Sequence, residues 1–134
     1  MDRETLQRYR YNRLELQRIE LQLEDLDGDL APSAARITGM PGGGKQSPDA
    51  GMIAVIQRRA ELLQRYLDLK AELLTEQGRI ELAIHRMPEP WRIILAYRYL
   101  VGLSWRKIED ATHYSYPHLQ RLHREALERL KGMG

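Results

Sequence analysis

The chain of 134 residues is 43% hydrophobic, carries a formal net charge of +2 and contains no cysteine, which suits one domain with an extended element or two small domains. The lack of cysteine excludes disulfide bonds, thiolate zinc sites and cysteine nucleophiles. Because no apolar run approaches the roughly 20 residues that span a bilayer, and because the N-terminus is not a signal peptide, we expect a cytoplasmic protein without membrane association.

Residues 5 to about 26 predict one continuous helix, because they contain no Gly or Pro and repeat apolar residues three or four apart. Asn12 lies in the same stripe, which resembles a coiled-coil seam with a polar interruption. The stripe comprises Tyr9, Leu16, Ile19, Leu23, Leu26 and Leu30. Gly28 and Pro32 end the helix, and residues 27 to 51, rich in Gly, Pro, Ser and Asp, predict a long loop.

A second long helix is predicted from about residue 50 to residue 86. Its apolar stripe comprises Ile53, Ile56, Ala60, Leu63, Leu67, Leu74, Ile80 and Ile84. Two long helices joined by a loop predict an antiparallel, coiled-coil-like hairpin, or pairing with the helices of a second chain. Residues 1–87 are therefore expected to form a domain for oligomerisation, as a dimer, or for partner binding. No stretch alternates with the period of a strand, so the predicted fold class is all-α.

Pro88 and Pro90 mark the expected boundary to a second domain, residues 88–134, because the residue before a proline disfavours helix and a proline suits the first turn of the next one. The first short helix of this domain is predicted from Trp91 to Leu100. Gly102 is expected to end it in the left-handed conformation that glycine adopts without strain. Its inward-facing side chains are predicted to be Ile94, Leu95 and Tyr99, covered by Leu103.

Ser104 and Ser115 are predicted to cap the two helices that follow, since a serine oxygen accepts a hydrogen bond from the free N–H groups of a first turn. The turn between these helices is residues 112–114, with Tyr114 as an apolar anchor, and Pro117 suits the first turn of the last helix. In the second helix the expected inward-facing side chains are Trp105, Ile108 and the small Ala111. The buried stripe of the last helix is predicted to be Leu119, Leu122, Ala126, Leu127 and Leu130.

Three short helices with brief connections and the longest helix last are typical of a helix-turn-helix, which places its last helix, here residues 115–131, in the major groove of double-stranded DNA. From His85 onward there are nine Lys and Arg against five Asp and Glu. Basic residues of the last helix suit phosphate contacts, namely Arg121, Arg124, Arg129 and Lys131. Gln pairs bidentately with adenine and Arg with guanine. The residues predicted to contact DNA are Ser104, Arg106, Lys107, Ser115, Tyr116, His118, Gln120, Arg121 and Arg124.

A resemblance to a known family is carried by Leu95, Arg98, Tyr99, Gly102, Ser104, Trp105 and Ile108, followed by Tyr114, Ser115, His123, Ala126 and Leu127. This region resembles the C-terminal part of small phage-encoded transcriptional regulators of the RinA and ArpU type, which is itself similar to region 4 of bacterial sigma factors. With the Gly-rich residues 39–44 and Ser47-Pro48, the resemblance covers roughly residues 35 to 131. It implies an activator of late phage genes that binds promoter DNA in the host cytoplasm. Tyr116 and Pro117 stand where sigma factors have charged residues, so no target sequence is carried over.

Segments that mimic catalytic or metal sites do not fit them. Residues 39–45 match the spacing of a phosphate-binding P-loop, but Gln46 stands where a Ser or Thr would hold magnesium, and no strand precedes. The acidic residues 25, 27 and 29 mimic a calcium loop, whose Gly and Glu positions are taken by Leu30 and Arg36. The pair His118 and His123 projects to different helix faces. We therefore expect no enzymatic activity, no cofactor and no metal ion.

Two alternatives stand beside a sequence-specific DNA-binding regulator. The first is a sigma-like factor that binds RNA polymerase through the helical hairpin and binds DNA weakly. The second is a DNA-packaging adaptor, since small terminase subunits also combine a helix-turn-helix with helices that assemble into rings.

Overall fold

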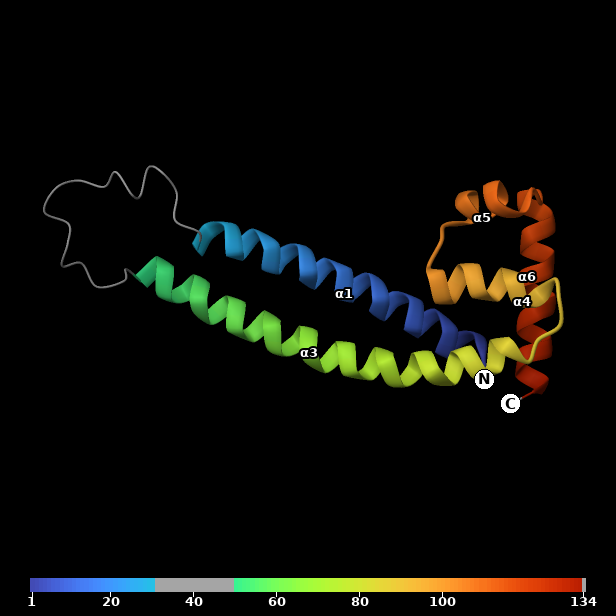
Figure 1. The fold of residues 1–134 in the computed structure, drawn as a ribbon, viewed down its shortest axis with the longest axis horizontal. Helices are drawn as coiled ribbons and strands as arrows, with labels where there is room; N and C mark the ends of the chain where they lie inside the picture. The colour runs from blue at the N-terminus through green and yellow to red at the C-terminus, as the bar shows by residue number, and fades with distance from the viewer. Residues whose placement is uncertain (31–49, 134) are drawn as a thin grey trace, which may run out of the picture. The chain divides into compact units, whose positions relative to one another are not determined.

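The computed structural model describes residues 1–30 and 50–133, and within these ranges the chain is helical with no strand. In chain order the elements are α1 (Arg3–Leu30), α3 (Ala50–His85), α4 (Trp91–Leu95), the π-helical segment η1 (Ala96–Val101), α5 (Trp105–Thr112) and α6 (Tyr116–Gly132) (Figure 1). The predicted all-α class is confirmed.

The predicted loop at residues 27–51 lies mostly outside the described residues, but its first end needs correction, because residues 27–30 continue α1. The predicted start of the second long helix near residue 50 is confirmed, since α3 begins at Ala50. A single glycine costs a helix only about 1 kcal/mol relative to alanine, so Gly28 does not end α1. The Gly-rich residues that contribute to the family resemblance, with the rejected P-loop match, also lie outside the described part of the chain.

The described chain falls into two compact units, one of residues 1–14 with 71–134 and one of residues 15–70. Both long helices contribute to both units, because α1 passes from the first to the second and α3 returns from the second to the first. This division differs from the expected boundary between residues 87 and 88. The first turns of α1 and the last turns of α3 group with the short C-terminal helices.

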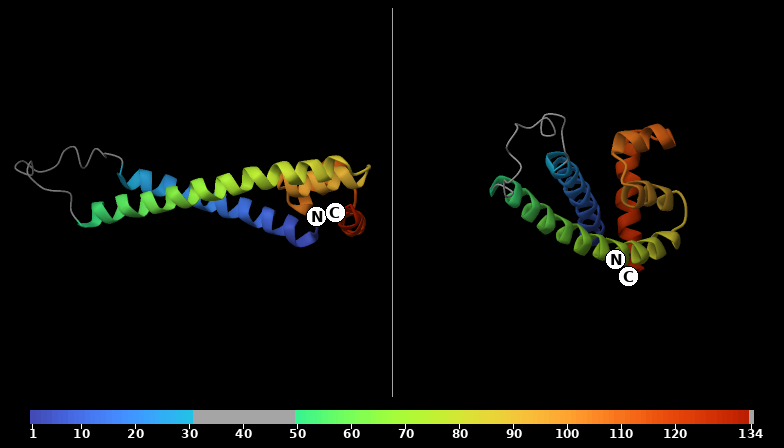
Figure 2. Two further views of the ribbon diagram at one scale, coloured as in Figure 1. Left: turned by 90° about the horizontal axis from the view of Figure 1, so that it is seen from below. Right: turned by 60° about the vertical axis from the view of Figure 1, so that its left-hand side comes forward.

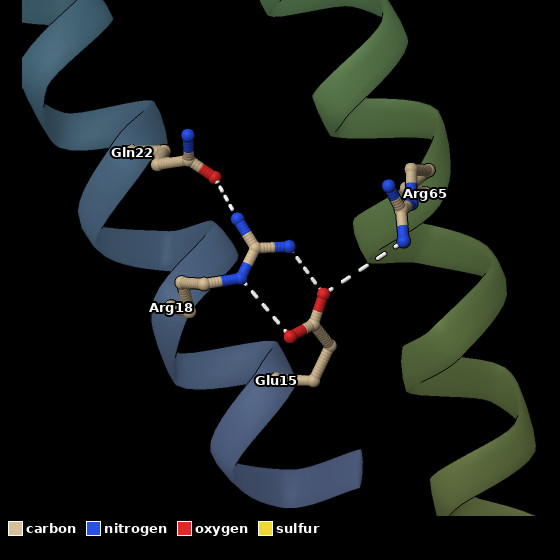
Figure 3. Close-up of polar contacts among 4 residues, drawn as sticks. All are labelled: Glu15, Arg18, Gln22 and Arg65. Carbon is tan, nitrogen blue, oxygen red and sulfur yellow. Dashed lines mark hydrogen bonds and ion pairs between the residues drawn. The ribbon is translucent and has the colours of Figure 1, made fainter.

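In the unit of residues 15–70, the α1 and α3 segments lie side by side and antiparallel, as the different views of Figure 2 agree. Asp27, late in α1, pairs with Arg59 at 2.5 Å, and the earlier Glu15 pairs with the later Arg65 at 3.7 Å. Figure 3 shows the Glu15 carboxylate between the guanidinium groups of Arg65 and Arg18, the latter also bonded to Gln22. The hydrogen bond from Arg18 lowers the pKa of the Glu15 carboxyl. Each of these exposed ion pairs contributes at most about 1 kcal/mol to the free energy of unfolding. They therefore matter more for the register of the two helices than for stability.

The buried stripe of α3 is only partly the predicted one. Ile80 and Ile84 are buried as expected, whereas much of the predicted stripe before them is exposed, namely Ile53, Ile56, Ala60, Leu67 and Leu74. Leu62 and Leu73 are buried instead. The buried residues Leu62, Leu73, Ile80 and Ile84 are 11, 7 and 4 residues apart, a spacing that also falls on one helix face, so helical periodicity alone does not decide between the two sets. Within the unit of residues 15–70, the pairing of α3 with α1 decides, because Leu62 is buried there together with Leu16 and Ile19 of α1.

The larger unit is built around the short helices. In Figure 1, α6 runs across two other segments and contacts both of them. One segment is α4 with its continuation η1, and the other is α5. Their shared core consists of Ile94, Ile108, Leu119 and Leu122, with Trp91, Tyr97, Leu103, Trp105 and Tyr114 packed around it. The first turns of α1, the end of α3 and the turn after it belong to the same unit. Their buried residues are Leu6, Tyr9, Ile80, Ile84 and Met87.

Most predicted inward positions of the short helices are confirmed, and one is wrong. Ile94, Leu95, Tyr99, Ile108 and the whole predicted stripe of α6 are buried. Ala111 is exposed. The inner side of α5 continues from Ile108 to Thr112, whose hydroxyl donates to the Ile108 carbonyl at 2.7 Å and accepts from the Tyr114 N–H at 3.3 Å. The chain leaves α5 at His113, in the left-handed conformation with φ +62°.

A π-helical turn and an arginine from α1 complete the first short helix. Gly102 ends η1 at φ +86°, as predicted for a glycine in the left-handed region. The carbonyls just before it accept hydrogen bonds from the Arg13 guanidinium, at 3.1 Å for Tyr99 and 3.4 Å for Val101, with Leu100 also bonded. A cation at this helix end satisfies carbonyls that have no partner within the helix and complements the negative end of the helix dipole.

Replacement of Arg13 by alanine is expected to lower the free energy of unfolding by about 1–3 kcal/mol, because several carbonyls lose a charged donor at once. Urea unfolding followed by circular dichroism measures the change. The matched control is Arg8→Ala, which removes an exposed arginine of the same helix and should stay close to the parent protein. Equal stability of the Arg13 and Arg8 variants would show that the helix end is satisfied by water.

Candidate nucleic-acid interface

The two serines predicted among the DNA contacts begin α5 and α6. The Ser104 hydroxyl oxygen accepts from the Lys107 N–H at 3.3 Å, and the Ser115 oxygen accepts from the His118 N–H at 3.3 Å. Both serines have extended backbone, and Pro117 lies in the first turn of α6, where its missing N–H costs no hydrogen bond. The predicted caps are confirmed, and they fix where α5 and α6 begin.

The two sides of α6 differ in chemistry. One side is buried against the other short helices and includes Leu119, Leu122, Ala126 and Leu130. The opposite side exposes Arg121 and Arg124, and Tyr116 is exposed in the first turn of the helix, with half of its surface accessible. Arg121 reaches Glu125 at 3.8 Å, an exposed contact too long and too hydrated to hold the guanidinium firmly. Arg106 and Lys107 are exposed in the first turn of α5.

His118 and Gln120 are placed differently from the exposed residues of α6. The His118 ring stacks on Tyr114, with centroids 4.8 Å apart and planes inclined by 19°, and is half-buried. Gln120 is also half-buried, and its amide nitrogen has no acceptor among the described residues. It lines a pocket together with residues of α1 and does not share the open surface of Arg121. The structure therefore exposes Tyr116, Arg121 and Arg124 on the surface. Gln120 lies in the pocket wall, apart from that surface.

Arg129, expected among the phosphate contacts, packs against Trp91. Its guanidinium carbon lies 3.8 Å from the centre of the Trp91 ring, a cation–π contact. The indole N–H of the same tryptophan donates to Glu125 at 3.0 Å. Trp91 thus connects α4 to the second half of α6. We therefore assign Arg129 to this contact between the two helices.

His123 is a buried polar side chain that sequence reasoning did not place in the core. It is 7% exposed, its Nε2 lies 2.7 Å from the Tyr99 hydroxyl, and the edge of its ring meets Trp105 with centroids 4.9 Å apart. Its pKa is lowered to about 4 from 6.5, mainly by burial and also by the charges of Arg3 and Arg98. The imidazole is therefore neutral near pH 7. Its position four residues after Leu119 and four before Leu127 is the signal that predicts burial.

No cluster of three or more His, Asp or Glu side chains suited to a metal ion occurs among the described residues. None of the helices in residues 1–30 and 50–133 is long and apolar enough to cross a membrane. Comparison of the chain with protein-family models, with curated proteins and with solved structures finds no match.

Proposed function

We propose that this protein is a transcription regulator that binds double-stranded DNA sequence-specifically, with α6 as the helix that enters the major groove. The observation that carries the proposal is the two-sided character of α6, which shares a core with α4 and α5. Its inner side is part of that core, its outer side presents Arg121 and Arg124, and Tyr116 is exposed in its first turn. Recognition helices contact bases through residues of their N-terminal part.

The exposed cations divide by expected role. Arg121 and Arg124 lie on the helix that would read bases, where a guanidinium bonds the O6 and N7 of guanine bidentately. Arg106 and Lys107 lie in the first turn of α5, which in a helix-turn-helix crosses the phosphate backbone. The resemblance to phage regulators of the RinA and ArpU type supports an activator of late genes that acts in the host cytoplasm.

We further propose that the long helices join two copies of the chain. The support is the exposed apolar stripe on α3, formed by Ile53, Ile56 and Leu67, of which 45%, 49% and 52% is accessible. These residues repeat at the spacing of a helix face and are not the stripe that packs on α1. Light scattering at micromolar concentration tests the proposal, and a monomer would contradict it.

Selection from random-sequence duplexes at physiological salt tests the proposed function directly. Enrichment of one sequence motif supports a specific regulator, and an inverted repeat within the motif supports a two-fold dimer. Retention without enrichment favours the packaging adaptor. No retention, together with co-purification of RNA polymerase, favours the polymerase-binding factor.

Substitution of Arg121 by alanine is expected to weaken binding to the selected duplex by about 1–3 kcal/mol and to relax the preference at one base pair. Fluorescence anisotropy with the selected duplex and its single-base variants measures both effects. Arg58→Ala is the control, because Arg58 is an exposed arginine of α3 outside the helix-turn-helix. Unchanged affinity and preference in the Arg121 variant would refute its place on the reading surface.

A further inference from the structure

A pocket of about 240 Å³ lies between the first turns of α1 and the short helices, inside the unit of residues 1–14 and 71–134. Its charged lining comes from Arg3, Arg10 and Arg98, and its amide lining from Gln7 and Gln120. The Tyr99 and His123 side chains, hydrogen-bonded to each other, also line it. The pocket therefore combines three guanidinium groups from two separate parts of the sequence.

The positive charge of this pocket has no negative counterpart in its wall. None of the described residues that line it is Asp or Glu. Arg98 is held over the Trp105 ring at 4.4 Å and donates to the Leu103 carbonyl at 3.1 Å, so its charge meets a ring and a carbonyl dipole. Burial lowers the pKa of Arg98, and the nearby charge of Arg10 lowers it further. Arg3 also lines a separate pocket together with Asp2 and Glu4.

Two hydrogen-bond donors in the pocket wall are buried without an acceptor. They are the Nε of Arg10 and the amide nitrogen of Gln120, neither of which has a partner among the described residues. A buried donor left unpaired costs about 1–3 kcal/mol, and more when it belongs to a charged group. The entry of an anion with several acceptor oxygens relieves the repulsion between the guanidinium groups. It also offers the two enclosed donors an acceptor once the Arg10 and Gln120 side chains turn toward the pocket.

We propose that this pocket binds an oxyanion of the phosphate type. A tetrahedral phosphate offers oxygens in several directions, and guanidinium groups bond such oxygens through paired N–H donors. The neutral amides of Gln7 and Gln120 supply donors without further repulsion, and the pocket volume admits one phosphate group with its water. The phosphate belongs either to a free phosphorylated compound or to the backbone of bound DNA, and only the second source rests on the proposed function.

Calorimetric titration of the full chain with inorganic phosphate, against chloride at equal ionic strength, tests the site. The expected result is saturable binding that Arg10→Gln weakens about tenfold or more through loss of a charge-assisted hydrogen bond. Arg8→Gln makes the same change of charge on the same helix outside this pocket and should leave phosphate binding unchanged.

A second variant keeps the test decisive if Arg10→Gln fails to fold. Gln120→Leu removes the other unpaired donor, so it should weaken phosphate binding while the phosphate-free protein becomes no less stable in thermal unfolding. The proposal would be overturned if both variants bound phosphate as tightly as the parent protein. It would also be overturned if the parent protein showed no saturable phosphate binding and Arg10→Gln had no effect on DNA binding.

The two sources of phosphate separate in a DNA-binding assay. If the backbone of DNA occupies the pocket, inorganic phosphate competes with the duplex, and Arg10→Gln lowers the slope of log affinity against log salt by about 1. If the ligand is a free phosphorylated compound, the parent protein and the Arg10→Gln variant bind the duplex equally well. Their affinities for inorganic phosphate still differ. Saturable phosphate binding by a protein that does not bind duplexes supports the pocket and contradicts the proposed function.

Discussion

Replacement of Leu119 by alanine is expected to lower the free energy of unfolding by about 3–4 kcal/mol, which is a large part of the 5–15 kcal/mol that holds a typical domain folded. Leu119 is fully buried in the core that joins α4, α5 and α6. The substitution removes buried methyl groups and leaves a cavity among Ile94, Ile108 and Leu122, which are fixed on three different elements and cannot all close in. Urea unfolding at constant pH measures the loss.

The control for this variant is Leu82→Ala, since 62% of Leu82 is accessible and its truncation leaves no cavity. The Leu119 variant should also lose affinity for duplex DNA near its lowered melting temperature, although every exposed cation of α6 is retained. A loss of stability no larger than in the Leu82 variant would mean that these three elements do not share one core.

Acidification from pH 6.5 to pH 4 is expected to remove about 3 kcal/mol of stability through His123 alone. The pKa of His123 is lowered to about 4 in the folded chain from 6.5. Between these two pH values the unfolded chain binds a proton at this residue and the folded chain does not. Its contribution is therefore fully present above pH 6.5 and is lost as the pH falls toward 4. Desolvation is the main cause, because the ring is enclosed by Tyr99 and Trp105.

The measurement is a set of urea unfolding curves between pH 4 and pH 7 for the parent protein and for His123→Gln. Glutamine keeps a hydrogen-bonding group near the Tyr99 hydroxyl but does not titrate, so the variant should lose the part of the pH dependence that belongs to His123. Subtraction of the two profiles cancels the carboxyl groups, which titrate in both proteins. The exposed His85 offers the control His85→Gln. Parallel profiles for the parent and His123→Gln would contradict a buried, neutral imidazole.

The helix ends of the C-terminal unit followed from the sequence because they depend on atoms a few residues apart. Ser104 and Ser115 each accept a hydrogen bond from the N–H three residues later, whatever the helix packs against. Gly102 takes φ +86°, a conformation that favours glycine for steric reasons within its own residue. The buried stripe of α6 was also predictable, since its apolar residues form a single face.

Where the sequence allowed two answers, packing chose between them. The helix α3 has two apolar faces, and tertiary packing buries the face of Leu62 and Leu73 while the face of Ile56 and Leu67 stays exposed. Ala111 is apolar and suitably spaced, yet the inner side of the short α5 turns instead through Thr112.

The candidate site divides in the same way. Exposure of Arg121 and Arg124 follows from their place opposite the apolar stripe of α6 and was predictable from the helix period, whereas Tyr116 is exposed in the first turn of the helix. Gln120 lies at the border of that stripe, and only the approach of α1 turns its surroundings into a pocket wall. Arg13 bonds to Tyr99, and Arg10 lines the same pocket as Arg98. Both pairs are more than 80 positions apart in the sequence, which no local pattern encodes.

The sequence by itself determined the all-α class, the caps of α5 and α6, the left-handed glycine and the apolar inner side of α6, because hydrogen bonds and steric limits within one or two turns govern each of them. The tertiary structure alone decided which face of α3 is buried, the neutral state of His123, the arginine that completes η1 and the charged pocket beside α1. Burial and pKa depend on which distant element comes to lie against a side chain, and that choice minimises exposed apolar area over the whole unit rather than along one helix.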